Sequence, residues 1–250
     1  GLDLQYRINT NSKLTFVLNP DFGQVESDPA DVNLTAYETY FPEKRPFFMA
    51  DIDIFETPIE IFYSRRIGEK AWGQGMTIYE STDRQDNDTL YYDVPEIIKS
   101  AGKLTGKTQS GLSYGLLGAV ATLDDSSRWA NLMTKGKNRY YFVTRIKQDL
   151  FAGNSFVGLM TTSSLADSAY TFSMDGRTNL LDNQLGIDGQ IIMTSEEHKG
   201  IYGNISYYPS GFFSGWIDYY YYDKDIDLND LGYLWRDDYT QTKLGLKFQT

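Results

Sequence analysis

The sequence predicts an all-β fold, an antiparallel up-and-down transmembrane β-barrel with an inserted segment of loop and short helix at residues 20–58. Three observations indicate this fold. Apolar and polar residues alternate along many segments, aromatic residues make up 15% of the chain, and no apolar run reaches the roughly 20 residues that a spanning helix needs. The chain begins and ends within alternating segments, so we expect residues 1–250 to be a fragment of a larger barrel.

Alternation is clearest in residues 184–193. Leu185 and Ile187 would lie on one face of a strand, and Asp188 and Gln190 on the other. A carboxylate turned into a dry core is costly, whereas the wide, hydrated interior of a membrane barrel accepts it. We therefore expect the apolar face to point toward lipid and the polar face toward the interior.

Comparable segments recur and are joined by short turns rich in glycine, asparagine and serine. We expect about twelve strands, including a short one at residues 76–79. Counting them places residues 20–58 at the same end of the sheet as the turns near Ala152 and Pro209, the periplasmic end. The alternative is a soluble sandwich or lipocalin-like barrel, with shorter strands and a mainly apolar interior. The other alternating segments are residues 2–8, 13–18, 140–147, 201–207 and 243–248.

The charge and residue composition of the chain limit the kinds of partner it can bind. The net charge of −11 argues against nucleic-acid binding, because a polyanion needs a positive surface. The absence of cysteine excludes disulfides and thiolate metal ligands. The run Tyr219, Tyr220, Tyr221 and Tyr222 favours an interfacial girdle at the edge of the bilayer, and a carbohydrate-stacking platform is the alternative. The expected location is the cell outer membrane, with its lipid bilayer as the partner and glycans or another envelope protein as further candidates.

Residues 20–58 interrupt the alternation. A short helix could start near Asp28 and must end before Pro42. A charged turn and two phenylalanines follow, so we expect the segment to fold into the barrel interior as a plug. Its charges would fix the segment to the wall, and they could also set the selectivity of a constriction. The predicted plug residues are Asp21, Glu26, Asp28, Glu38, Glu43, Lys44, Arg45, Phe47, Phe48, Arg65 and Arg66.

Two motifs resemble a known family: Asn-Pro-Asp-Phe-Gly-Gln-Val-Glu at residues 19–26 and Phe-Pro-Glu-Lys-Arg-Pro-Phe-Phe at residues 41–48. The resemblance is to uncharacterised outer-membrane barrels usually found after a carbohydrate-binding-type β-sandwich module in Bacteroidota and related bacteria. Shorter motifs at residues 62–68, 102–107 and 153–155 extend it over most of the chain. It implies an outer-membrane barrel. A role in glycan capture or uptake would depend on the N-terminal module rather than on these residues.

One cation site is a candidate. Asp223, Asp225, Asp227 and Asn229 place oxygen atoms at alternate positions, which suits calcium. An EF-hand would need glycine where Leu228 stands, so a solvated acidic loop is the alternative. No other cofactor is expected.

The sequence does not favour an enzyme. His198 is the only histidine and lies in a polar turn, which gives a catalytic triad little support. Carboxylate pairs such as Asp237 and Asp238 are ordinary in so acidic a chain. We expect an outer-membrane channel or scaffold that serves glycan capture or uptake together with an N-terminal module. The alternatives are a surface-anchored glycan hydrolase with carboxylates in its loops and a structural subunit of an envelope complex.

Overall fold

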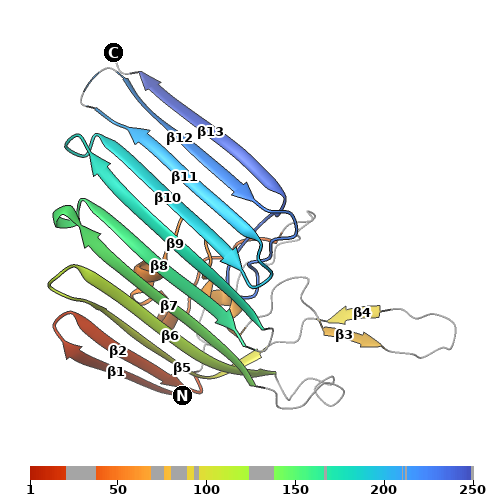
Figure 1. Ribbon diagram of the computed structural model, residues 1–250. Coiled ribbons are helices and arrows are strands. Elements are labelled where there is room, and N and C mark those ends of the chain that lie inside the picture. Colours follow the sequence, from red (N-terminus) through yellow and green to blue (C-terminus); the bar gives the residue numbers. More distant parts are fainter. Residues whose placement is uncertain are drawn as a thin grey trace.

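Eleven strands form one antiparallel sheet in the described part of the chain, in the order β1-β2-β5-β6-β7-β8-β9-β10-β11-β12-β13 (Figure 1). The computed structural model describes residues 1–20, 38–68, 76–79, 89–92, 96–123, 138–165, 168–209, 211 and 213–248. The strands of the large sheet are β1 (Leu2–Asn9), β2 (Ser12–Leu18), β5 (Glu96–Lys107), β6 (Leu112–Leu123), β7 (Asn138–Leu150), β8 (Ser155–Ser164), β9 (Ala169–Leu180), β10 (Leu185–Thr194), β11 (Lys199–Tyr207), β12 (Phe213–Tyr222) and β13 (Tyr239–Phe248).

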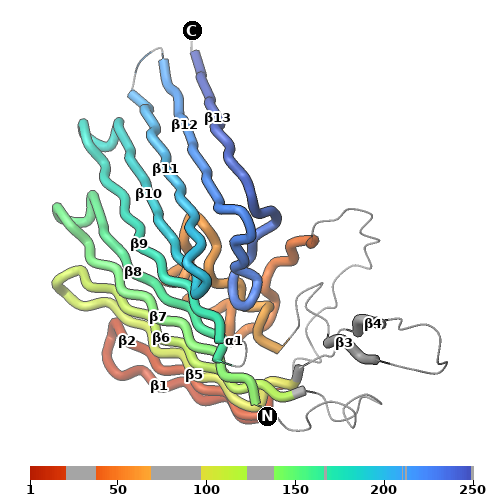
Figure 2. The backbone as a smooth tube through the Cα atoms, turned by 45° about the vertical axis from the view of Figure 1, so that its right-hand side comes forward, coloured from red at the N-terminus to blue at the C-terminus, as the bar shows by residue number. Residues whose placement is uncertain are grey.

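The predicted all-β antiparallel fold is confirmed, and so is the strand at residues 76–79. That strand, β3 (Met76–Tyr79), pairs only with β4 (Thr89–Tyr92) in a separate two-stranded sheet. The large sheet is curved but open (Figures 1 and 2). Within the described residues, β1 and β13 are its two edges and do not pair with each other. Closure into a barrel therefore belongs to the proposal below.

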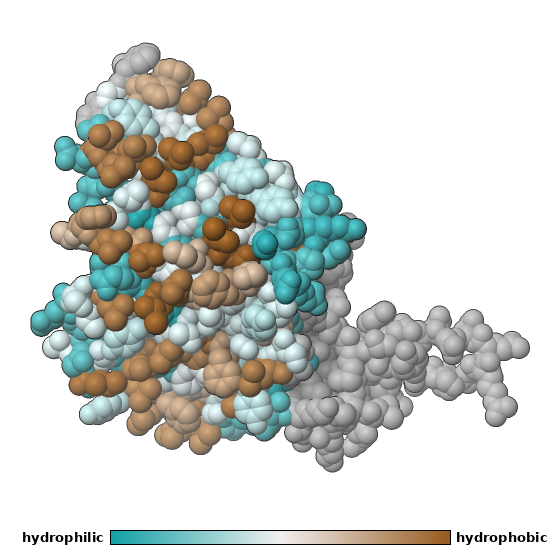
Figure 3. Space-filling model, viewed as in Figure 1, coloured by the Kyte–Doolittle hydropathy of each residue, from teal (hydrophilic) through white to brown (hydrophobic). Residues whose placement is uncertain are grey.

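The two faces of the sheet differ as the alternation predicts. In β10, Ile187, Ile191 and Met193 are exposed, whereas Gln190 and Ile192 are buried on the opposite side. We call the side with the exposed apolar residues the outer face and the other the inner face. Figure 3 shows the outer face, where brown side chains are spread over the strands from β1 to β13. Each strand contributes one or more, for example Leu4, Leu14, Ile97, Leu116, Phe142, Leu159, Met174, Ile187, Ile205, Ile217 and Leu244.

The predicted end of the sheet for residues 20–58 is wrong. The chain passes from β7 to β8 and from β11 to β12 at one end of the sheet, which is also the end of the turn between β1 and β2. The chain leaves β2 at the opposite end. The prediction counted residues 76–79 as a strand of the large sheet. In the structure β3 pairs with β4, and β2 pairs directly with β5. Every later turn therefore lies at the end of the sheet opposite to the one predicted relative to β2.

Residues 38–68, which we call the insert, lie on the inner face together with residues 223–238, the β12–β13 loop (Figure 2). The insert contains α1 (Pro46–Met49) and the 3-10 turns η1 (Ile52–Phe55) and η2 (Ser64–Arg66). None of the described helices is long and apolar enough to cross a membrane. The helix expected from Asp28 falls mostly outside the described residues, and residues 38–41 are not helical.

An apolar core fills the space between the insert and the middle of the sheet. Phe48, Phe55 and Ile59 of the insert are buried against inner-face residues that include Val143 and Met160. Leucines of the β12–β13 loop complete this core. The inner face is therefore not polar throughout: where the insert covers it, apolar side chains are buried together with polar ones such as Lys103 and Gln190.

Candidate functional site

The insert turns sharply at the charged residues that the sequence singled out. Arg45 Nη2 lies 2.7 Å from Glu43 Oε2, and Ser64 Oγ donates to the same oxygen at 2.6 Å. Burial alone would raise the pKa of Glu43, but the hydrogen bonds and positive charge of Arg45 outweigh it and lower the pKa. Arg45 also donates to the carbonyl oxygens of Ser64 and Ile67 at 2.8 and 2.6 Å. This arginine therefore holds both ends of the insert together.

Arg66 joins the insert to the β12–β13 loop. Its two terminal nitrogens donate to the two carboxylate oxygens of Glu38, each at 2.7 Å. Its Nε donates to the carbonyl oxygen of Gly232 at 2.9 Å, and its Nη2 to Asn229 Oδ1 at 2.9 Å. The side chain is buried, and these partners satisfy its charge and its donors. Two segments that are far apart in the sequence thus form one folded unit.

Three tyrosines of this unit, Tyr40, Tyr63 and Tyr233, pack on one another. The ring of Tyr63 lies 5.0 Å from that of Tyr40 and 5.5 Å from that of Tyr233, measured between centroids. Burial raises the pKa of Tyr40 and of Tyr63 to about 12. Tyr40 donates its hydroxyl hydrogen to Glu60 at 3.2 Å, and burial raises the pKa of Glu60 to about 6. Glu60 is therefore an acid in the insert that changes charge under mildly acidic conditions.

Polar side chains of the sheet bind the backbone of the insert. Lys103 of β5 donates from Nζ to the carbonyl oxygens of Phe47, at 2.7 Å, and of Ala50. Gln190 of β10 donates to the carbonyl oxygen of Ile59 at 3.2 Å. These contacts satisfy buried backbone groups at two distant strands. They support the view that the charged and polar residues fix the insert to the sheet.

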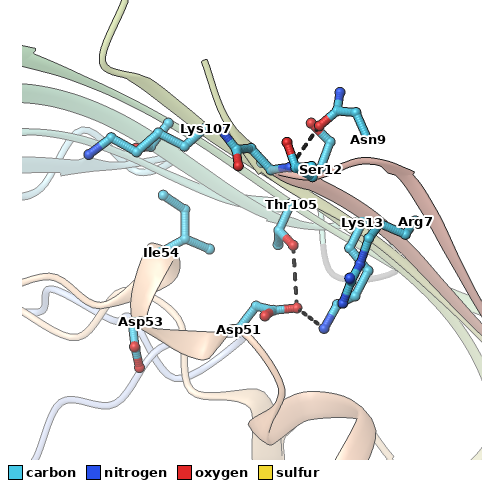
Figure 4. A pocket seen from close by; sticks show the side chains of 13 residues that line it. Arg7, Asn9, Ser12, Lys13, Asp51, Asp53, Ile54, Thr105 and Lys107 are labelled. Atoms are coloured by element: carbon cyan, nitrogen blue, oxygen red, sulfur yellow. Dashed lines mark hydrogen bonds and ion pairs between the residues drawn. The ribbon is translucent and has the colours of Figure 1, made fainter. Parts of the chain in front are cut away.

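A cavity of about 430 Å³ remains between η1 and the strands β1, β2, β5 and β6 (Figure 4). Asp51 lies on its wall, 2.6 Å from Lys13 Nζ and 3.4 Å from Thr105 Oγ1. Arg7 and Lys107 line the same space. Its walls are polar and charged, so it suits water and small hydrophilic solutes rather than an apolar ligand.

The family model described as Domain of unknown function (DUF5916) matches residues 1–250. The chain belongs to this family. Neither a curated protein nor a solved structure matches it. The family description names no activity and no location, so the outer-membrane resemblance stays a prediction.

In this DUF5916 chain, the structure brings together most of the described plug residues. Glu43 pairs with Arg45, Glu38 pairs with Arg66, and Phe47 and Phe48 are buried side by side. Of the remaining residues, Lys44 donates its backbone N–H to Glu43 at 3.0 Å, and the Arg65 guanidinium lies 5.7 Å from the Phe41 ring centre. Asp21, Glu26 and Asp28 lie outside the described residues.

The sequence interpretation missed the partners of these residues in the sheet and the loop. Lys103 and the Gly232 carbonyl were not singled out, and Gln190 was placed on the polar face of its strand but not as a partner of the insert. Lys103 and Gln190 occupy polar positions within alternating strands, and that signal could have pointed to them. Nothing in the sequence marks Gly232, because its role depends on a backbone oxygen.

Three of the four candidate calcium residues of the DUF5916 chain accept hydrogen bonds from protein donors. Asp223 accepts hydrogen bonds from the Lys199 N–H and the Tyr221 hydroxyl, each at 2.7 Å. Asp227 accepts from the Asn229 N–H at 2.8 Å, and Asn229 accepts from Arg66. Asp225 uses its backbone N–H to bind Asp237 at 3.2 Å. Over the described ranges, no group of three acidic or histidine side chains is arranged to hold a metal ion. The calcium site stays a prediction.

The four tyrosines at residues 219–222 divide between the two faces. Tyr219 is exposed on the outer face, and Tyr221 shares that face by alternation. Tyr220 packs on Tyr202 with ring centroids 5.0 Å apart, and the buried Tyr222 stacks on Tyr239 at 6.2 Å. Only the outer pair can take part in the predicted girdle.

Proposed function

We propose that the chain forms the wall and plug of an outer-membrane β-barrel, which acts as a closed channel or a scaffold. The observation that carries the proposal is the outer face. Each strand of the large sheet exposes large apolar side chains there, and none of the described segments covers them. Soluble proteins rarely leave a contiguous apolar surface of this extent in water, whereas lipid would bury it.

Strand length supports the same proposal. The strands from β5 to β13 have 9 to 13 residues. A strand tilted by about 45° needs roughly 9–11 residues to cross a bilayer. The inner face carries buried polar side chains such as Arg145, Asp175 and Gln190. A hydrated lumen accounts for this division better than a soluble sandwich, whose inner faces are mainly apolar.

The connections suggest an orientation. The three longest connections follow β2, β6 and β12, and all three leave the sheet at the same end. The connections at the other end are short turns. Outer-membrane barrels keep short turns on the periplasmic side and longer loops outside. On this reading the insert enters from the outside and reaches toward the periplasmic end, where Asp51 meets Lys13.

Spin labelling tests the proposal, and the chain suits it because it has no cysteine. Single cysteines would be introduced at adjacent positions on opposite faces, in the full chain reconstituted into liposomes. The first pair of positions is Asn204 and Ile205, and the second is Ile217 and Asp218. We expect labels at the two isoleucines to relax with oxygen, which dissolves in lipid. Labels at Asn204 and Asp218 should relax with a water-soluble nickel complex. Relaxation of the isoleucine labels by the nickel complex would overturn the proposal.

Planar-bilayer recordings then separate a closed channel from a scaffold. The full chain would be compared with an Arg66→Met, Lys103→Met double variant, which lacks one side-chain tie of the insert to the loop and one to the sheet. A channel predicts low conductance for the parent and frequent openings for the variant. A scaffold predicts no current from either protein.

A further inference from the structure

Five polar side chains form a row across the inner face of neighbouring strands near the β13 edge. The register pairs Arg177 with Asp188, Asp188 with Asn204, Asn204 with Asp218, and Asp218 with Lys243. Arg177 donates to Asp188, and Asn204 donates to Asp218 at 2.6 Å. Two cations and two carboxylates balance within the row. The row therefore offers donors and acceptors without a net charge.

Aromatic rings lie on both sides of this row along β12. Tyr220, two residues beyond Asp218, packs on Tyr202 with ring centroids 5.0 Å apart. Trp216, two residues before Asp218, faces Gly245 of β13. A Cβ at Gly245 would collide with three atoms of the indole, so the indole lies against the backbone of β13. All three rings are partly exposed.

The spacing of the rings suits an extended ligand. Residues two apart on a strand are separated by about 6.6 Å, so Trp216 and Tyr220 stand about 13 Å apart with Asp218 between them. Lys243 Nζ lies 5.2 Å from the centre of the Tyr220 ring and connects the polar row to the aromatic one. Two aromatic platforms thus lie on either side of the polar row: the row runs across the strands, and the platforms are spaced along them.

This combination matches the chemistry of a sugar chain. A pyranose ring has an apolar C–H face that stacks on an aromatic ring and a rim of hydroxyls that both donate and accept hydrogen bonds. An anionic ligand would meet the carboxylates of Asp188 and Asp218 in the same row, and Arg177 is already hydrogen-bonded to Asp188. A purely apolar ligand would displace water from Asp218 and Asn204 without replacing the hydrogen bonds that the water makes.

We propose that Trp216, Tyr202 and Tyr220, with Asp218 and its neighbours in the row, form a binding track for a neutral oligosaccharide on the inner face of β11–β13. The inference rests on the proposed function, because the track can meet a solute only if the inner face lines a hydrated interior. Its place along β12 would guide the sugar along the axis of the strands.

Tryptophan-fluorescence titration of the full chain in detergent micelles tests the track. The probes are maltohexaose, cellohexaose and chitohexaose. We expect a saturable change with one or more of them, about tenfold weaker in Tyr220→Ala and in Asp218→Ala. The Tyr220→Phe variant keeps the ring and should bind within about threefold of the parent. Tyr219→Ala is the matched control, because Tyr219 is adjacent but lies on the outer face; its affinity should be unchanged.

Two outcomes would overturn the track: no saturation with any probe up to its solubility limit, or equal losses in the Tyr219 and Tyr220 variants. Either one would leave the spin-label pattern of the outer face intact. Conversely, if the labels on the outer face did not relax as expected in lipid, the proposed function would fail regardless of the result of the sugar titrations. The two failures are therefore distinguishable. Each variant's spin-label pattern also shows whether it has folded.

Discussion

Arg145 on β7 reaches Asp175 on β9 across the strand that separates them. The Nη2 atom of Arg145 lies 2.7 Å from Asp175 Oδ2, and each side chain is only 2% exposed. The guanidinium passes over Gly158 of β8, where a Cβ atom would lie 2.6 Å from Nη1. A glycine in the middle strand is what allows the pair to form.

Removing the charge of Asp175 should be costly. In Asp175→Asn the guanidinium of Arg145 stays buried without its counter-ion, and we expect a loss of about 3–5 kcal/mol in the free energy of unfolding. The measurement is urea denaturation in detergent micelles. The control is Asp188→Asn, whose partner Arg177 is 55% exposed, and it should lose less than about 1 kcal/mol. Similar losses in both variants would contradict the assignment of a buried pair.

A methyl group at Gly158 should push the same guanidinium away from Asp175. We expect Gly158→Ala to lose about 1–3 kcal/mol in the free energy of unfolding, because the core must shift to make room. Gly203→Ala is the matched control, since nothing lies within 4 Å of a Cβ built there. Its loss should be near zero. Equal stability of the two variants in the same denaturation assay would argue against the contact.

Lys103→Met should loosen α1 without unfolding the sheet. The variant removes the hydrogen bonds that Lys103 donates to the carbonyl oxygens of Phe47 and Ala50. Leaving these buried oxygens without a partner should cost about 1–3 kcal/mol. Hydrogen exchange at the Ala50 amide is the measurement, and we expect it to accelerate. Lys13→Met, which removes a partly exposed ion pair with Asp51, should leave that rate nearly unchanged.

Glu60 should make the protein more stable at mildly acidic pH. Burial raises the pKa of Glu60 to about 6 from its ordinary value of 4.5. Between these values the folded chain keeps a proton that the unfolded chain has lost, so stability falls as the pH rises through this window. Relative to Glu60→Gln, the parent should gain about 1 kcal/mol when the pH is lowered from above 6 to 4.5.

A second variant reverses the sign of this pH dependence. The pKa of Glu43 is lowered by Arg45, so the stability that Glu43 contributes is present above its ordinary value of 4.5 and is lost as the pH falls below it. The difference between the parent and Glu43→Gln should therefore shrink on further acidification. Denaturation curves measured across the pH range check both variants. A rising difference for Glu43 would show that its pair with Arg45 is not formed.

The strands and their faces could be predicted from the sequence because alternation is a local signal. Leu185 and Ile187 share one face and Asp188 and Gln190 the other, as their spacing requires. The charged turn of Glu43 and Arg45 was also identifiable, since two prolines rigidify it. These features depend on residues a few positions apart.

The remaining features depend on distant residues. Whether β3 joins the large sheet or pairs with β4 is a choice between long-range partners, and that choice reversed the expected end of the sheet for the insert. Alternation also applies within the tyrosine run, where Tyr219 and Tyr220 point to opposite faces. The prediction of a girdle from aromatic content placed all four tyrosines of the run together, although alternation puts them on two faces.

The bond between Arg66 and Gly232 has a consequence for how the chain folds. Arg66 is synthesised early, but the carbonyl oxygen that its Nε requires is 166 residues further along the chain. A contact of such separation forms late, because the intervening chain must first be brought together. We therefore expect the strands from β5 to β12 to pair before this bond closes, so that the insert docks on the inner face last. During that interval the nascent sheet has two unsealed sides and depends on its surroundings to keep it from aggregating.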